Sequence, residues 1–190
     1  VAEDLDGKVP VILDAGEVGI GIESTIIDLT EAIPMILRPG YVTKRMLEEV
    51  IGPVRTDPGM ISEDSSVKPK APGMKYRHYA PKADLIIVDG EKKAVIDKIN
   101  ALTACMQTKG MRVGVIGTDE TAAHYTGDVV LSMGAREDED AIARRLYRIL
   151  REFDEREIHV IYSESFDSPG IGQAVMNRLL KAAGHQVCVV

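Results

Sequence analysis

The sequence predicts an α/β protein in two unequal parts joined by a long connection. From Ala83 to the C-terminus, strand and helix patterns alternate regularly, which is typical of a parallel sheet with right-handed crossovers. Residues 1–51 show only short strands and one helix, and prolines and glycines punctuate residues 52–82. We therefore expect the end of one domain at 1–51, a linker at 52–82 and a small doubly wound domain at 83–190.

Residues 1–51 predict three short strands and a helix. Apolar runs at residues 9–13, 22–29 and 35–37 each match a strand, and the last runs into the turn Arg38-Pro39-Gly40. Thr43 is a good N-cap for a helix over 44–51, which Gly52-Pro53 ends. These elements would need further strands and helices to cover them. Because the chain also begins at Val1 without an initiator methionine, we expect it to be a fragment of a longer protein.

Residues 83–190 predict a regular series of strands and helices. The expected strands are 85–88, 112–116, 129–132, 158–162 and 186–190. The expected helices are 91–108, 138–153 and 172–183, and a short segment at 119–125 takes the place of a further helix. Within 138–153 the apolar residues fall at helical spacing, so one face of that helix should cover the sheet.

Composition and charge exclude several classes of function. The net charge is −7 and the isoelectric point is about 5.2, which argues against a general nucleic-acid binder, so we expect no direct nucleic-acid contact. No apolar run approaches the length of a membrane span, and we expect no membrane contact. Cys105 and Cys188 lie far apart and indicate two thiols in a reducing cytoplasm. The four histidines show no ligand spacing, so we expect no protein-bound metal site.

The linker contains the most informative segment of the chain, residues 72–81 (PGMKYRHYAP). No acidic residue occurs from Ser65 to Ala83, although the protein as a whole is acidic. A plain tether needs no aromatic residues, whereas tyrosines and basic groups supply stacking surfaces and anion-binding donors. We therefore interpret this segment as a lid that closes over a phosphate-bearing ligand, formed by Lys75, Tyr76, Arg77, His78 and Tyr79.

A hydroxyl and a guanidinium mark a second candidate site. Ser24 opens a strand after the turn Gly19-Ile20-Gly21, and it serves either the strand alone or a ligand. The turn is no dinucleotide fingerprint, because a strand and not a helix follows it. Arg38 ends the neighbouring strand and is either a solvated turn arginine or a bidentate phosphate contact. If the two strands pair, Ser24 and Arg38 share one cleft.

The loop from Ser163 to Gln173 is the weaker candidate for a ligand site. It follows an expected strand at the carboxyl edge of the sheet, where open α/β folds bind ligands. It contains no Gly-Lys-Ser or Gly-Lys-Thr, so it is no Walker loop. We favour a tight turn there over a binding loop.

In four segments taken in order, the chain resembles the threonylcarbamoyl-AMP synthase family in its longer form. The matching segments are Gly21–Leu29 (GIESTIIDL), Ile36–Gly40 (ILRPG), Pro72–Pro81 and Ala174–Leu179 (AVMNRL). The resemblance implies that residues 1–51 are the C-terminal part of a YrdC-like catalytic domain. It also implies that residues 83–190 are a Rossmann-like C-terminal domain, with the lid between the two.

The resemblance further implies an activity. The family makes threonylcarbamoyl-adenylate from L-threonine, bicarbonate and ATP, with Mg²⁺ accompanying the ATP, for the t6A modification of tRNA. By this resemblance Ser24 contacts L-threonine, and Arg38 and Tyr79 contact ATP. Lys75, Tyr76, Arg77 and His78 support the lid. No catalytic residue and no oligomeric state follows from it.

Three readings of the chain stay open at this point. It is part of an enzyme, or its last domain is a regulatory or small-ligand module without catalysis, or that domain is a structural docking surface. The family's upstream phosphate-binding and threonine-binding residues have no counterpart in this chain. We therefore expect the 190 residues alone to have little or no synthase activity.

Overall fold

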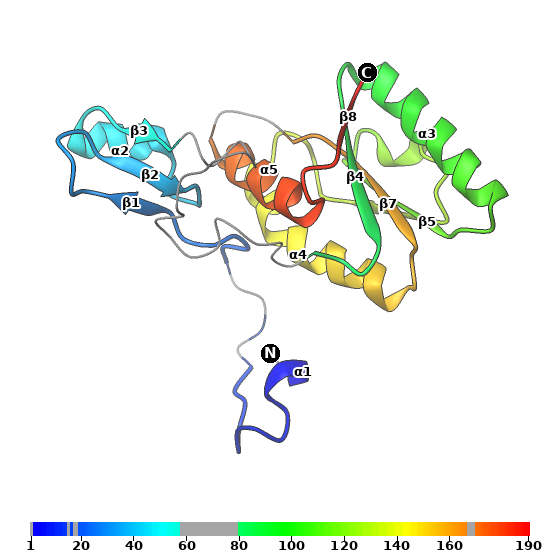
Figure 1. The fold of residues 1–190 in the computed structure, drawn as a ribbon, viewed down its shortest axis with the longest axis horizontal. Coiled ribbons are helices and arrows are strands. Elements are labelled where there is room, and N and C mark those ends of the chain that lie inside the picture. The colour runs from blue at the N-terminus through cyan, green and yellow to red at the C-terminus, as the bar shows by residue number, and fades with distance from the viewer. Residues whose placement is uncertain (1, 15, 17–18, 58–79, 167–169) are drawn as a thin grey trace.

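The structure is a computed structural model that describes residues 2–14, 16, 19–57, 80–166 and 170–190. Its larger part is a five-stranded parallel sheet in the order β6-β5-β7-β4-β8 (Figure 1). The strands are β4 (Asp84–Asp89), β5 (Val113–Gly117), β6 (Val129–Ser132), β7 (Val160–Glu164) and β8 (Val187–Val189). This confirms the doubly wound parallel sheet that the sequence predicts for residues 83–190.

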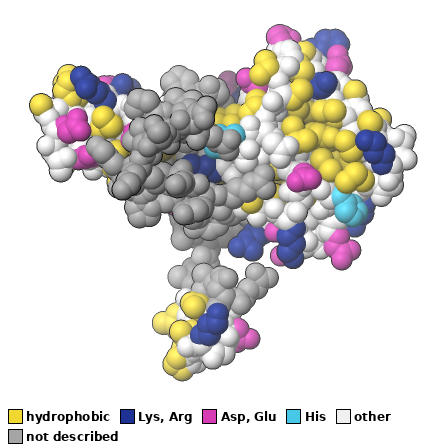
Figure 2. Space-filling view, in the orientation of Figure 1, with side chains coloured by type: hydrophobic (Ala, Val, Ile, Leu, Met, Phe, Trp, Pro, Cys, Tyr) yellow, Lys and Arg dark blue, Asp and Glu magenta, His cyan; other side chains and the backbone are white. Residues whose placement is uncertain are grey.

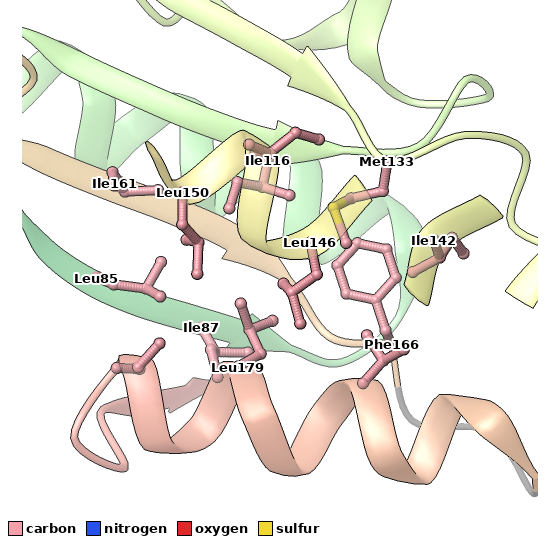
Figure 3. Packing of buried hydrophobic residues seen from close by; sticks show 14 of the residues in the cluster. Leu85, Ile87, Ile116, Met133, Ile142, Leu146, Leu150, Ile161, Phe166 and Leu179 are labelled. Atoms are coloured by element: carbon pink, nitrogen blue, oxygen red, sulfur yellow. The ribbon is translucent and has the colours of Figure 1, made fainter. Parts of the chain in front are cut away.

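Helices cover both faces of this sheet. Helix α3 (Lys92–Thr108) packs on one face, and α4 (Glu139–Glu155) and α5 (Ile171–Ala182) pack on the other. Successive side chains of each strand point to opposite faces of the sheet, so the apolar residues of one strand pack against the helices on both sides. Figure 3 shows the second layer, where Leu146 of α4 and Leu179 of α5 point toward Leu85 and Ile87 of β4. A short 3-10 helix, η2 (Ala122–His124), replaces a full helix between β5 and β6.

A smaller sheet precedes this domain. It contains β1 (Ile26–Asp28), β2 (Met35–Arg38) and β3 (Arg55–Thr56), and α2 (Lys44–Ile51) follows β2. Strand β2 pairs with β1 in antiparallel and with β3 in parallel orientation. Thr43 caps α2 as expected, since its side chain accepts a hydrogen bond from the Met46 amide at 3.3 Å.

Two local expectations for the first 57 residues were wrong. Residues 9–13 form no strand, and Leu13 is 92% exposed. An apolar run becomes a strand only when a partner strand pairs with it, and the residues described here offer none. Conversely, β3 lies within the stretch expected to be linker, and a four-residue helix, α1 (Ala2–Leu5), lies apart from both sheets (Figure 1).

The residues just before β1 join the small sheet to the larger domain. Ile22 is 7% exposed and belongs to the core cluster built around α4 and α5. Gly21 lies so close to α4 that an added Cβ would stand 2.4 Å from Arg144 Cα, so only glycine fits there. Residues 21–24 are therefore held directly against the helical layer of the larger domain. Among the described helices, none is long and apolar enough to cross a membrane.

Candidate functional site

Ser24 and Arg38 lie together, as the pairing of their strands predicts. Ile26 of β1 stands opposite Arg38 of β2, and the register shifts between Ile26 and Ile27. The Arg38 guanidinium donates from Nε to the Ser24 carbonyl at 3.0 Å and from Nη2 to Ser24 Oγ at 3.2 Å. The backbone and the hydroxyl of Ser24 thus fix the arginine in one orientation. The hydroxyl remains exposed at the surface.

The turn that follows Arg38 packs tightly against the same strand. Gly40 is buried, and an added Cβ would lie 2.3 Å from the Glu23 carbonyl oxygen and 2.5 Å from the Thr25 amide nitrogen. A side chain at this position would push the two segments apart. Thr25 Oγ1 completes the junction by donating to the Val42 carbonyl at 2.6 Å. The Ser24–Arg38 geometry therefore depends on close backbone contact at Gly40.

Glu23, the neighbour of Ser24, contacts two residues of the larger domain. Tyr147 of α4 donates its hydroxyl to Glu23 Oε2 at 2.7 Å. Arg178 of α5 places Nε 2.5 Å from the same oxygen, and its side chain is only 3% exposed. Neither Nε nor Nη2 of Arg178 meets hydrogen-bond geometry with a partner in the described residues, so we treat the contact as an ion pair.

Lys181, one turn after Arg178 on α5, adds a third cation to this cluster. Its side chain is buried, with 8% of the residue exposed. Its pKa is lowered from 10.5 to about 8, chiefly by burial and then by the positive charges of Arg178 and Arg38, whereas Glu23 acts to raise it. Glu23 pairs with Arg178 and acts electrostatically on Lys181, and Arg38 acts on Lys181 as well. This gathering of cations near the Ser24 hydroxyl suits an anionic ligand.

A cleft of about 730 Å³ lies along the residues that follow Arg38, although neither Ser24 nor Arg38 lines it. One wall comes from residues 39–48, including Lys44 and Arg45. The opposite wall comes from the starts of α4 and α5, where Glu139 Oε2 accepts from the Ile171 and Gly172 amides at 3.0 and 3.3 Å. The cleft is large enough for a nucleotide-sized ligand.

Several predicted site residues lie outside the described residues. These are the lid residues Lys75, Tyr76, Arg77, His78 and Tyr79. The predicted loop from Ser163 to Gln173 is shorter than expected at both ends. Ser163 lies within β7 (Val160–Glu164), and α5 begins at Ile171. In the parts of the chain that are described, no three His, Cys, Asp or Glu side chains gather to hold a metal ion.

Glu23, Tyr147, Arg178 and Lys181 were not predicted as site residues. The sequence does contain a signal for two of them. Arg178 and Lys181 occur on a helix whose other residues, apart from Gln173 and Asn177, are apolar or small, and lysine and arginine are rarely buried without a partner. Two basic residues at helical spacing in a buried helix therefore indicate a polar contact across the helix.

Comparisons with known proteins match most or all of the chain. A family model described as the C-terminal domain of threonylcarbamoyl-AMP synthase matches residues 42–184. Proteins named threonylcarbamoyl-AMP synthase from Bacillus subtilis and Pyrococcus abyssi are 46% and 45% identical over 98% and 100% of this chain. The chain covers 52% and 54% of those proteins, so it spans about half of their length.

Solved structures give the same result. The structure of Pyrococcus abyssi Sua5 complexed with L-threonine is 43% identical to this chain and superposes with a TM-score of 0.88. The match covers 100% of this chain and 54% of that protein. A variant of the same Pyrococcus protein matches with the same TM-score and identity.

Proposed function

The chain belongs to the threonylcarbamoyl-AMP synthase family, and we propose that it forms the C-terminal half of an enzyme that makes threonylcarbamoyl-adenylate. The proposed reaction combines L-threonine, bicarbonate and ATP and releases pyrophosphate, which makes the enzyme a nucleotidyltransferase. Its product supplies the t6A modification of tRNA.

The arrangement of Ser24 and Arg38 beside the basic cluster carries this proposal. In an adenylylation an oxygen nucleophile displaces pyrophosphate from the α-phosphorus, so negative charge builds on the leaving group. Arg38, held by Ser24, offers donors to that charge, and the nearby cations of α5 reinforce the local potential. We assign Arg38 to the ATP phosphates.

The threonine contact is assigned to Ser24. Support comes from the related Pyrococcus protein, whose structure was determined with L-threonine. Mg²⁺ would enter the site with ATP, as part of the substrate, and would help to neutralise the charge of the phosphates. Tyr79 is assigned to ATP, and Lys75, Tyr76, Arg77 and His78 to the lid that closes over it.

The test measures threonine-dependent pyrophosphate release by the longer protein that includes the upstream catalytic part. Arg38→Ala should lower the rate by about tenfold or more, the value of one charge-assisted hydrogen bond. Arg156→Ala is the matched control, because in the described part of the chain the Arg156 side chain pairs with Glu152, one turn earlier on α4. Equal rates for the two variants would remove Arg38 from the site.

A second measurement compares the longer protein with this 190-residue chain. We expect the chain alone to release little or no pyrophosphate, because it spans about half of its relatives. A rate equal to that of the longer protein would mean that residues 1–190 contain the complete site.

We propose that this portion makes no direct contact with tRNA. The net charge is −7, and acidic and basic side chains are interspersed on the face that Figure 2 shows. A tRNA-binding surface needs a continuous basic area to neutralise phosphates. A gel-shift experiment with unmodified tRNA and this chain tests the point, and salt-sensitive binding would contradict it.

A further inference from the structure

The larger domain has a second pocket, of about 260 Å³, at the carboxyl edge of its sheet. Strands β4 and β7 are parallel neighbours, so both end at this edge. The chain leaves β4 toward α3 on one face and leaves β7 toward α5 on the other. Such a divergence of two adjacent strands opens a crevice between their ends, which is the usual ligand position in open α/β sheets. The pocket lies between Gly90 after β4 and Ser165 after β7.

A buried carboxylate forms the inner wall of this pocket. Glu164, the last residue of β7, is 3% exposed. Its Oε1 accepts from Thr121 Oγ1 and, at 2.7 Å, from the Tyr125 hydroxyl, while Arg136 Nη2 contacts Oε2. Gly117 of β5 leaves room for this group, because a Cβ there would lie 2.9 to 3.2 Å from Tyr125, Thr121 and Glu164.

Glu164 holds Arg136 in place at the mouth of the pocket. The guanidinium also donates from Nη1 to the Ser165 carbonyl at 3.2 Å, and its carbon lies 5.7 Å from the centre of the Phe166 ring. These contacts use two of its five N–H donors within the described residues. The arginine side chain remains 48% exposed. Arg136 is thus rigidly oriented and still offers donors to a ligand.

This arrangement is costly if its only purpose is stability. The Glu164 carboxylate is almost fully buried and loses its hydration, which opposes folding unless partners compensate for the loss. The charge of Glu164 is nevertheless buried at the end of β7, where Thr121, Tyr125 and Arg136 contact it as donors. A fixed supporting group behind an exposed arginine is typical of binding sites, where preorganisation preserves affinity.

The opposite wall adds further attraction for an anion. Helix α3 begins at Lys92, and no side chain in the described structure caps its first turn. The first-turn amides and the helix dipole favour negative charge at that end, and Lys92 adds a full positive charge. The carboxylate of Asp89, at the end of β4, accepts a hydrogen bond from Ser165 Oγ at 2.5 Å.

We propose that this pocket binds the phosphate group of a small metabolite, with Arg136 and Lys92 as its cationic contacts. The volume limits the ligand to about the size of a mononucleotide. The site shares no residue with the Ser24–Arg38 cluster, and it stands whether or not the proposed synthase function is correct.

The test titrates inorganic phosphate and then AMP into the 190-residue chain and follows backbone amide shifts by NMR. The largest shifts should occur at residues 90–95 and 136, and tighter binding of AMP than of phosphate would identify a mononucleotide site. Lys92→Ala should weaken phosphate binding about tenfold, the value of a charged contact, and should not disturb folding because Lys92 is exposed. Arg156→Ala is the control and should leave this binding unchanged, because Arg156 pairs with Glu152 and does not line the pocket.

A second variant tests the inner wall without leaving an unpaired charge. Arg136→Met combined with Glu164→Gln removes both charges and keeps a side-chain acceptor for Thr121 and Tyr125. This variant should lose phosphate binding and keep its cooperative thermal transition. If it does not fold, Lys92→Ala alone decides. Absence of binding, shifts near Ser24 in place of residues 90–95, or equal affinities for wild type and Lys92→Ala would each overturn the proposal.

Discussion

The ion pair between Glu23 and Arg178 makes a quantitative prediction about how the two parts of the chain are joined. Glu23→Gln keeps the shape of the side chain and an acceptor for Tyr147 but removes the negative charge. Arg178, 3% exposed, then lies buried beside Lys181 without its carboxylate. Removing one partner of a fully buried pair costs about 3–5 kcal/mol. Because Glu23 is itself 23% exposed and the Tyr147 contact survives, we expect about 2–3 kcal/mol.

Two measurements detect this loss. Urea denaturation followed by circular dichroism reports global stability, and hydrogen exchange in residues 20–42 reports local release from α4 and α5. A loss of 2–3 kcal/mol corresponds to exchange faster by about 30- to 150-fold. The control is Glu49→Gln, which breaks a pair with Arg45 whose side chains are 60% and 80% exposed, and it should cost under about 0.5 kcal/mol. If neither measurement separates Glu23→Gln from this control, the pair does not hold the two parts together.

Two further predictions concern buried groups. In the folded protein Lys181 has a pKa of about 8 against 10.5 ordinarily, so the unfolded chain binds more protons between those values and stability rises with pH across that window. Lys181→Met should therefore be more stable than wild type at pH 7, by about 1–3 kcal/mol, and urea titrations should show this advantage shrinking by pH 10. Tyr125→Phe should cost about 1–3 kcal/mol in thermal unfolding, because the buried carboxylate that ends β7 loses a donor. Tyr162→Phe, the matched control, should be neutral or stabilising, because its buried hydroxyl has no hydrogen-bond partner among the described residues. If Tyr162→Phe lowered the stability more than Tyr125→Phe, the hydrogen bonding of these two hydroxyls would be contradicted.

The fold of residues 83–190 could be predicted because its signals are local. Each strand is a short apolar run, each helix carries an apolar stripe, and parallel pairing follows from their alternation. The expected strands and helices match the observed ones apart from shifts at their ends. The first 57 residues were harder, because strand formation there depends on partners that the local sequence does not identify. Residues 9–13 have the pattern of a strand, but no strand among the described residues pairs with them. The two residues of β3 pair with β2 although their sequence gives almost no signal.

Some residues of the candidate site could be predicted from the sequence and others could not. Ser24 and Arg38 could be placed together because they flank strands that are neighbours in sequence and pair as a hairpin. The contacts of Glu23 with α4 and α5 could not, because nothing in the residues around Glu23 specifies which distant helix meets it. The pocket between β4 and β7 depends on strand order, which alternation alone does not determine.

The cost of the basic residues on α5 argues that the larger domain contributes to the chemistry beside Ser24. A helix selected only for packing would carry apolar side chains at positions 178 and 181, since burying charge opposes folding. Glu23 pairs with Arg178, and the positive charge of Arg38 acts on Lys181. The three basic side chains Arg38, Arg178 and Lys181 therefore interact electrostatically close to Glu23 and Ser24. An anion bound there recovers part of the free energy that the fold loses by burying Arg178 and Lys181, so ligand binding should tighten the contact between the two parts of the chain.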